Sequence, residues 1–381
     1  MNIWKPFKIL LVIGNVLFLF RNISFVSKRI RAIMIIAIIV EISISIYNCY
    51  IIAYFCLYYH LSDCVNIYMV FWNSLVLIFF SCYYSEKFKK LLISFNEFNS
   101  FFIKDEFYSK KNNNRNPILI IFFILFVITK IVLIFVTRKY YNPLRRKFSV
   151  FFAVCLRINT LLNDIRYFYE YFLLYAILGI ISDQLDCIIR SVDKEIKYNS
   201  SYLEKIQVNH IKLSIKTISY EKNVKQWSQI YSGIAESTDK FNDVFGIQMT
   251  IMLISAVTYI TIFLYTITFL SVHGLYDTST LIVYIQKTII MQIQILILSY
   301  TAQRINNKVL TLRRRLGALL LDSVNDYNRY RITKDLLRFI SYRRLQIKAF
   351  GSFSVDMTLP PSCVMLFTSY TVIALQFNNV L

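Results

Sequence analysis

The chain ends in the apolar stretch LPPSCVMLFTSYTVIALQFNNVL (359–381), which decides the class of fold. Pro360 and Pro361 are tolerated in the first turn of a helix, where the backbone N–H groups have no partner within the helix. The 21 residues from 361 to 381 would form a helix of about 30 Å, which matches the hydrocarbon thickness of a bilayer. We therefore predict that 359–381 spans a membrane.

The composition agrees with a membrane protein. Hydrophobic residues make up 56% of the 381 residues and charged residues 17%, whereas soluble domains carry about 25% charged residues. The 7 Gly and 5 Pro are few, which favours long helices. The 7 Cys form no CxxC pair, and no GxGxxG, P-loop or HExxH motif is present, so the sequence predicts no metal site, no cofactor and no enzyme.

Seven stretches are long and apolar enough to cross a bilayer as helices. They are 32–58, 64–85, 117–137, 167–189, 245–272, 278–302 and 359–381. The predicted fold class is an all-α polytopic membrane protein with seven transmembrane helices.

Lys and Arg are distributed very unevenly among the connections. The N-terminal segment 1–31 and the connections 86–116, 190–244 and 303–358 hold 34 of them, the opposite side holds 7, and two lie inside predicted spans. Because cytoplasmic loops retain basic residues, we predict a multi-pass plasma-membrane protein with a cytoplasmic N-terminus and an extracellular C-terminus. This placement accounts for the net charge of +21 without nucleic acid as a partner.

Two segments are harder to place. The stretch ILLVIGNVLFLF (9–20) is too short to span, and Arg21 stands where a signal-peptide cleavage site would need small residues, so 1–31 is interpreted as an amphipathic segment on the cytoplasmic membrane surface. The segment 138–166 is basic although it is assigned to the outside. Its apolar piece FSVFFAVCL (148–156) is either a re-entrant helix or the true start of the fourth span.

The two long basic segments show helical periodicity. Apolar residues recur at helical spacing from Ile305 to Val324 and from Ile206 to Ile218, opposite basic faces. We expect the spans to continue into the cytoplasm and to pack into one anchor domain, with a helix that ends near 357. The predicted parts are thus the N-terminal segment, the spans within 32–189, a helical segment 190–244, the spans within 245–302, an anchor segment 303–358 and the last span.

Three charged residues lie inside predicted spans and should face the bundle, a partner or a water-filled cavity. We expect Glu41 to face the bundle, Lys130 to reach the membrane interface, and Lys287 to line a cavity or join a hydrogen-bond network. A pocket of aromatic and polar residues in the outer halves of the spans is the candidate ligand site. Its candidate residues are Tyr68, Trp72, Tyr265, Tyr284, Gln286 and Lys287.

The last span carries a sparse polar stripe. Ser362, Ser369 and Gln376 recur every seven residues and share one face with Met365 and Val372. Such a stripe either lines a pore among several copies or forms hydrogen bonds within its own bundle.

The sequence SYTVIALQF (369–377) resembles the C-terminal signature of insect gustatory receptors, which is Thr-Tyr, five hydrophobic residues and Gln-Phe. Tyr370, Gln376 and Phe377 match at the family's spacing, and Ser369 stands in place of Thr. AFGSFSVDMTL (349–359) is similar to the family's stretch before the last span, and QLDCIIRSVDKEI (184–196) to the end of its fourth span.

The resemblance implies a tastant-gated, non-selective cation channel that assembles as a homotetramer or a heteromer with related receptors. It implies that the last helices surround the pore, that Gln376 and Phe377 lie at the gate, and that a small-molecule tastant binds in the outer half of each subunit. An insect odorant receptor would share this architecture. A seven-span G-protein-coupled receptor conflicts with the charge distribution, and a transporter would more often show internal repeats.

Overall fold

The computed structural model describes residues 5–56, 61–102, 121, 123–132, 150–203, 210–272, 278–323, 326–351 and 353–377. Within these ranges the chain is almost entirely helical. The helices are α1 (Lys5–Val16), α2 (Lys28–Cys56), α3 (Leu61–Tyr83), α4 (Ser85–Phe102), α7 (Val150–Leu203), α8 (His210–Val272), α9 (Thr278–Asp322), α10 (Tyr327–Tyr342) and α11 (Leu359–Phe377). A short helix, Phe123–Val132, precedes α7, and the two-residue strands β1 (Lys348–Ala349) and β2 (Phe353–Ser354) form a hairpin.

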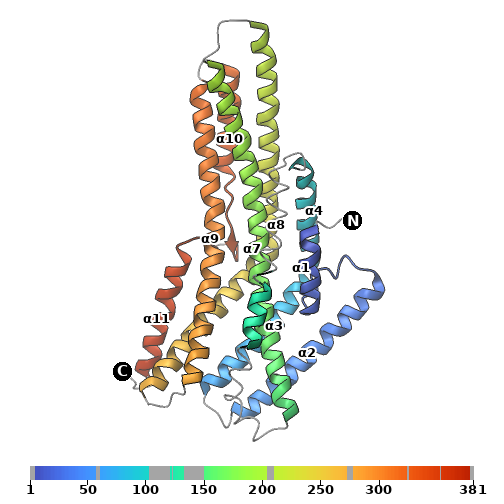
Figure 1. Ribbon diagram of the computed structural model, residues 1–381, viewed down its shortest axis with the longest axis vertical. Coiled ribbons are helices and arrows are strands. Elements are labelled where there is room, and N and C mark those ends of the chain that lie inside the picture. Colours follow the sequence, from blue (N-terminus) through green and yellow to red (C-terminus); the bar gives the residue numbers. More distant parts are fainter. Residues whose placement is uncertain are drawn as a thin grey trace.

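Three long helices form the frame of the molecule. Helices α7, α8 and α9 contain 54, 63 and 45 residues and pack against one another (Figure 1). At 1.5 Å per residue α8 is about 95 Å long, three times the thickness of a bilayer core. The predicted continuation of spans into long helical extensions is therefore confirmed, and α10 packs against α8 and α9 in that extension.

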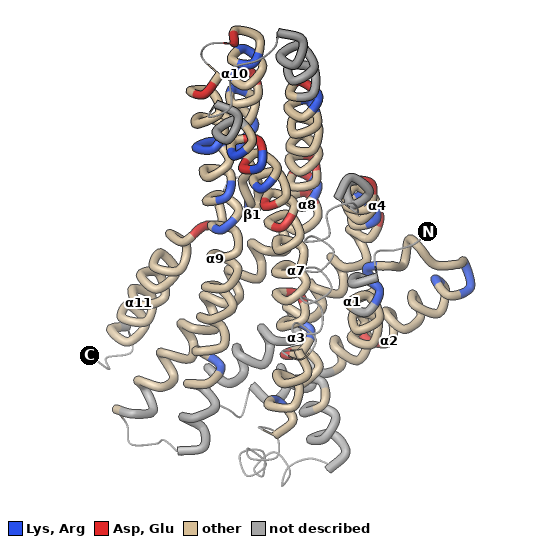
Figure 2. Tube along the Cα trace, turned by 45° about the horizontal axis from the view of Figure 1, so that its top comes forward, with Lys and Arg blue, Asp and Glu red and all other residues tan. Residues whose placement is uncertain are grey.

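Charge divides the molecule along its long axis. Figure 2 shows Lys, Arg, Asp and Glu gathered around α10 and the adjoining parts of α7, α8 and α9, with further charges on α1, α4 and the start of α2, whereas the end opposite α10 carries few. Among the described residues, four helices are long and apolar enough to cross a membrane: Lys28–Tyr47, Thr160–Tyr198, Tyr220–Thr268 and Leu359–Gln376. Two shorter apolar helices, Trp72–Tyr83 and Phe123–Val132, accompany them.

The helix of the fourth predicted span begins before 167, in agreement with the alternative that 148–156 is the start of that span. Helix α7 begins at Val150, so residues 150–166 belong to the helix that was expected to begin at 167, and 148–156 is no re-entrant segment over its described part. The physical reason is continuity, since no Gly or Pro interrupts the chain between Pro143 and Gly179.

The anchor segment also ends differently from the prediction. The last helix before α11 stops at Tyr342, not near 357, and is followed by the hairpin, in which Lys348 pairs with Ser354 and Ala349 with Phe353. Phe350 and Gly351 turn the chain with φ angles of 50° and 70°, a region that glycine enters without steric cost. Helix α11 then begins at Leu359, so both prolines lie in its first turn as predicted.

The N-terminal segment is packed into the bundle. Leu10 and Leu11 of α1 are buried, and the Tyr169 hydroxyl on α7 donates to the Leu10 carbonyl at 2.8 Å. Farther along, Arg21 is buried and its guanidinium bonds Glu170 of α7 and Gln248 of α8, each at 2.6 Å. The N-terminal segment is thus held by side-chain contacts with α7 and α8. The hypothesis of a helix on the membrane surface does not predict these contacts.

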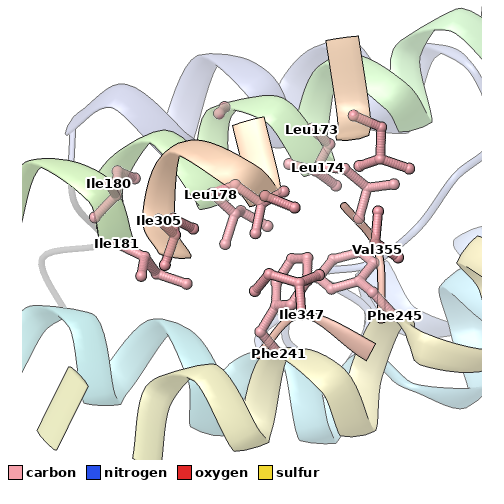
Figure 3. Packing of buried hydrophobic residues seen from close by; sticks show 14 of the residues in the cluster. Leu173, Leu174, Leu178, Ile180, Ile181, Phe241, Phe245, Ile305, Ile347 and Val355 are labelled. Carbon is pink, nitrogen blue, oxygen red and sulfur yellow. The ribbon is translucent and has the colours of Figure 1, made fainter. Parts of the chain in front are cut away.

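Buried hydrophobic side chains gather where the hairpin meets the long helices. Figure 3 shows Phe241 of α8 beside Ile347 and Val355, which flank the two strands of the hairpin, and Ile305 of α9 closer to Leu178 of α7. All five side chains are buried. The hairpin therefore fixes the segment from which α11 starts to the frame of α7, α8 and α9.

Asn242 of α8 holds the hairpin by two hydrogen bonds. Its Nδ2 donates to the Gln346 carbonyl at 2.9 Å and its Oδ1 accepts from the Lys348 N–H at 3.0 Å. Asn242→Ala should lower the free energy of unfolding by about 1–3 kcal/mol, because two partly buried bonds are lost. Denaturant titration of the purified protein in micelles measures this loss. The matched control Asn307→Ala, at an exposed position on α9, should change stability far less, and equal losses would contradict the role of Asn242.

Candidate ligand pocket and exposed terminal helix

A pocket lies between five helices, away from the charged end around α10. Its volume is about 30 Å³, room for about two water molecules, so a larger ligand requires side chains to move. Its wall contains both polar and aromatic side chains. They include Asn73 and Ser74 of α3, Phe126 and Lys130 of the short helix, Asn163, Asp164 and Tyr167 of α7, Tyr259 and Phe263 of α8, and Lys287 and Gln294 of α9.

An ion pair lies in the wall of this pocket. Lys130 Nζ is 2.7 Å from Asp164 Oδ2, and the lysine side chain is only 7% exposed. The expectation that Lys130 reaches the membrane interface is therefore wrong. The physical reason is that Asp164, one of the residues newly included in α7, offers a partner within the bundle, and a paired charge is cheaper to bury than a lone one.

Hydrogen bonds hold other side chains of the wall. Ser255 donates to Asn73 Oδ1 at 2.7 Å, and Asn73 Nδ2 donates to the Tyr259 hydroxyl at 3.4 Å. The Tyr167 hydroxyl donates to the Met252 carbonyl at 2.5 Å. These bonds hold the aromatic rings of α7 and α8 in place, so the wall is preorganised on this side.

A second charged cluster adjoins the pocket. Arg166 of α7 is fully buried, and its guanidinium bonds Glu41 of α2 at 2.5 Å. It also donates to the Leu17 carbonyl at 2.7 Å, to Ser74 at 2.8 Å and to Asn163 at 3.0 Å. The expectation that Glu41 faces the bundle is confirmed. Arg166, however, was counted among the charges of an outer connection and lies inside the bundle instead.

The predicted ligand residues divide into three groups. Lys287 lines the pocket, and its neighbour Gln286 is half-buried but not part of the wall. Trp72 is 57% exposed and Tyr265 is half-buried outside the wall. The side chains of Tyr68 and Tyr284 lie outside the described set.

Sequence reasoning missed Asn73, Asn163, Asp164, Tyr167 and Tyr259. Asp164 and Arg166 were detectable, because they stand two residues apart in an uninterrupted run of helix formers that continues into Glu170. The others look like ordinary packing residues until the helices are assembled.

Helix α11 is attached to the bundle along one face only. Cys363, Phe367, Thr371 and Leu375 are buried at intervals of four residues, and α11 packs against α8 and α9. Only 22% of its apolar stretch is buried, against 83% for the corresponding part of α7. Figure 1 shows α11 at the side of the bundle, beside α9 and directed away from α10.

The polar stripe of α11 points away from its own bundle. Ser362, Ser369 and Gln376 are exposed, as are Met365 at 74% and Val372 at 41%. The Ser362 hydroxyl donates to the carbonyl of Thr358, just before α11, and the Ser369 hydroxyl to that of Met365 within α11, each at 2.8 Å. Among the signature residues Tyr370 is also exposed, and the side chain of Phe377 lies outside the described set.

Asp356 ends the hairpin segment just before α11. Its carboxylate accepts from the Thr358 hydroxyl at 2.5 Å and from the Thr358 N–H at 2.9 Å. These hydrogen bonds hold the pKa of Asp356 below its usual value, so the group is ionised at neutral pH. A carboxylate at a helix N-terminus also interacts favourably with the helix dipole.

The same fold occurs in a solved chemoreceptor structure. The insect olfactory receptor OR5 from Machilis hrabei superposes with a TM-score of 0.63 at 11% identity, over 92% of this chain and 90% of that chain. The structure of that receptor in complex with eugenol gives a TM-score of 0.63 at 10% identity, over 92% of this chain and 91% of that chain. No protein-family model and no curated protein matches the chain. At this identity the likeness establishes the fold.

Proposed function

We propose that the chain is a subunit of a ligand-gated, non-selective cation channel of the insect chemoreceptor type. The observation that carries the proposal is the polar stripe of α11, which is exposed along the helix. Its serine hydroxyls donate to carbonyls one turn earlier in the chain and, among the described residues, not to another helix. Water or symmetric copies of the same helix would satisfy such a stripe in a membrane. Several copies around an axis, as a homotetramer or a heteromer, place Ser362, Met365, Ser369, Val372 and Gln376 along a pore, with Gln376 and Phe377 at its gate.

The orientation proposed for the subunit follows its charge. The half around α10 is basic and lies in the cytoplasm with the N-terminus, whereas α11 ends outside. Seven spans fit this arrangement when 64–85, 117–137 and 278–302 are counted with the four long apolar helices. The plasma membrane is the proposed location.

Ligand binding reaches the pore through shared helices. The pocket is bounded by α8 and α9, and α11 packs against the same two helices. A small-molecule ligand that separates the pocket walls therefore also displaces the supports of α11. Moving a closed-to-open ratio from 99:1 to 1:99 takes about 5.5 kcal/mol, or about 1.4 kcal/mol from each of four pockets.

Two sensory roles share this architecture. The signature residues Ser369, Tyr370, Gln376 and Phe377 favour a gustatory receptor gated by a tastant. The fold of OR5 fits an odorant-receptor-type channel at least as well. Currents evoked by sugars and bitter compounds support the first role, and currents evoked only by volatile compounds support the second.

The decisive experiment is a whole-cell recording. Cells that express the chain, alone or with a related receptor, should give a ligand-evoked cation current, and Gln376→Ala should change its gating or ion selectivity because the polar ring at the gate is lost. Gln292→Ala, at an exposed position on α9, is the matched control and should leave the current unchanged. A response that depends on a G protein, with the N-terminus outside, would overturn the proposal.

A further inference from the structure

The pocket carries an unbalanced positive charge. Lys130 and Lys287 line it, and Asp164 is the only acidic residue among the described residues of its wall, which leaves one net positive charge. Lys130 takes the ion pair with Asp164, while Lys287 Nζ lies 5.8 Å from the centre of the Phe263 ring. The neighbouring Arg166 does not alter the balance, because Glu41 neutralises it.

The polar atoms of the wall are mostly donors. Asn163 Nδ2 is buried and has no hydrogen-bond partner, and the Lys287 ammonium has three N–H groups. The Tyr259 hydroxyl accepts from Asn73 and keeps its own proton for another acceptor. Against these donors stands one buried acceptor without a partner, Gln294 Oε1. A ligand that matched this wall would bring acceptors and negative charge.

The remainder of the wall is apolar and aromatic. Phe126, Phe263, Ile290 and Met291 surround the polar groups. A bare inorganic anion would lose its hydration against these side chains without compensation, whereas an apolar body carrying one anionic group would contact both parts of the wall.

We propose that the pocket binds a small organic monoanion, a carboxylate on an aromatic-sized apolar body, with Lys287 as the residue that receives the carboxylate. This inference rests on the proposed function in one respect, namely that the pocket is the ligand site. Binding requires wall side chains to move apart, because the cavity of about 30 Å³ has room for about two water molecules. It then places the carboxylate beside Lys287, with the Tyr259 hydroxyl and Asn163 amide as further donors, and restores neutrality to a charged site within the membrane.

Matched pairs of carboxylate and amide test the proposal on the full chain purified in micelles. The probes are benzoate with benzamide and phenylacetate with phenylacetamide, each up to 10 mM, and the readout is saturable thermal stabilisation. In at least one pair the carboxylate should bind about 10- to 100-fold more tightly than its amide, the usual effect of replacing a charged hydrogen-bond partner by a neutral one. Lys287→Met should abolish that difference, and Lys287→Arg should retain it.

Each other outcome overturns the assignment of the ligand class. These outcomes are equal binding of carboxylate and amide, undiminished carboxylate preference in Lys287→Met, and binding of neither member of either pair. Because the readout is binding, it separates the two proposals. Carboxylate binding that opens no current in cells expressing the chain, either alone or with a related receptor, overturns the channel. Currents evoked by neutral compounds and unaffected by Lys287→Met keep the channel and overturn the anionic ligand.

Discussion

Arg166→Met should lower the free energy of unfolding by about 3–5 kcal/mol, because it leaves the Glu41 carboxylate buried without its counter-charge. Arg166 also bonds Leu17, Ser74 and Asn163, so the substitution removes a side chain that joins the N-terminal segment, α2, α3 and α7. A large fall in the thermal unfolding temperature of the purified protein, and loss of surface expression, are the expected observations.

The partner of Arg166 supplies the control. Glu41→Gln should cost less, since the amide oxygen still accepts from Arg166 and the guanidinium keeps three other acceptors. The double variant Glu41→Met with Arg166→Met should recover much of the stability lost in Arg166→Met, because no unpaired charge remains buried. Equal stability of Arg166→Met and the wild-type protein would show that the buried pair is not formed.

Phe245→Ala should cost about 3–5 kcal/mol, the usual loss for a fully buried aromatic side chain. The Phe245 ring lies 5.1 Å from that of Phe241, 6.0 Å from that of Phe88 on α4, and 4.8 Å below the Arg21 guanidinium. The substitution therefore weakens the hairpin core in Figure 3 and the attachment of the N-terminal segment together.

Phe353→Ala on β2 is the matched control for Phe245→Ala. The Phe353 side chain is 67% exposed and lies at the same level of the molecule, so its removal creates no cavity. Denaturant titration in micelles should place Phe353→Ala close to the wild-type protein and Phe245→Ala far below it. Similar free energies for the two variants would contradict the packing at this junction.

The sequence predicts those helices whose length and apolar pattern are visible within the segment itself. The apolar length of 359–381 and its two prolines located α11 to within a few residues, and helical periodicity revealed the long extensions. The same reasoning fails at 150–166. Three charged residues within this apolar run predict an outer connection, whereas the segment is part of α7. A local count of charges cannot distinguish a solvated arginine from one whose partner lies 125 positions earlier, as Glu41 does for Arg166.

The residues of the candidate site also divide into those that the sequence reveals and those that only the structure reveals. Glu41 and Lys287 were recognised because a charge within an apolar span is costly and therefore informative. Asn73, Asn163 and Tyr259 carry no such signal, and the pocket is made by five helices whose relative rotation the sequence does not state.

The sequence by itself determined that this protein is an all-α membrane protein with a basic end, because hydrophobic length and charge distribution act on each segment separately. Only the tertiary structure decided which charges neutralise one another and which side of α11 is left uncovered. It also decided that the pocket holds two lysines and one aspartate, which leaves one net positive charge. Those properties depend on distances of a few ångströms between residues that are far apart in the chain, since ion pairs and packing act only at contact.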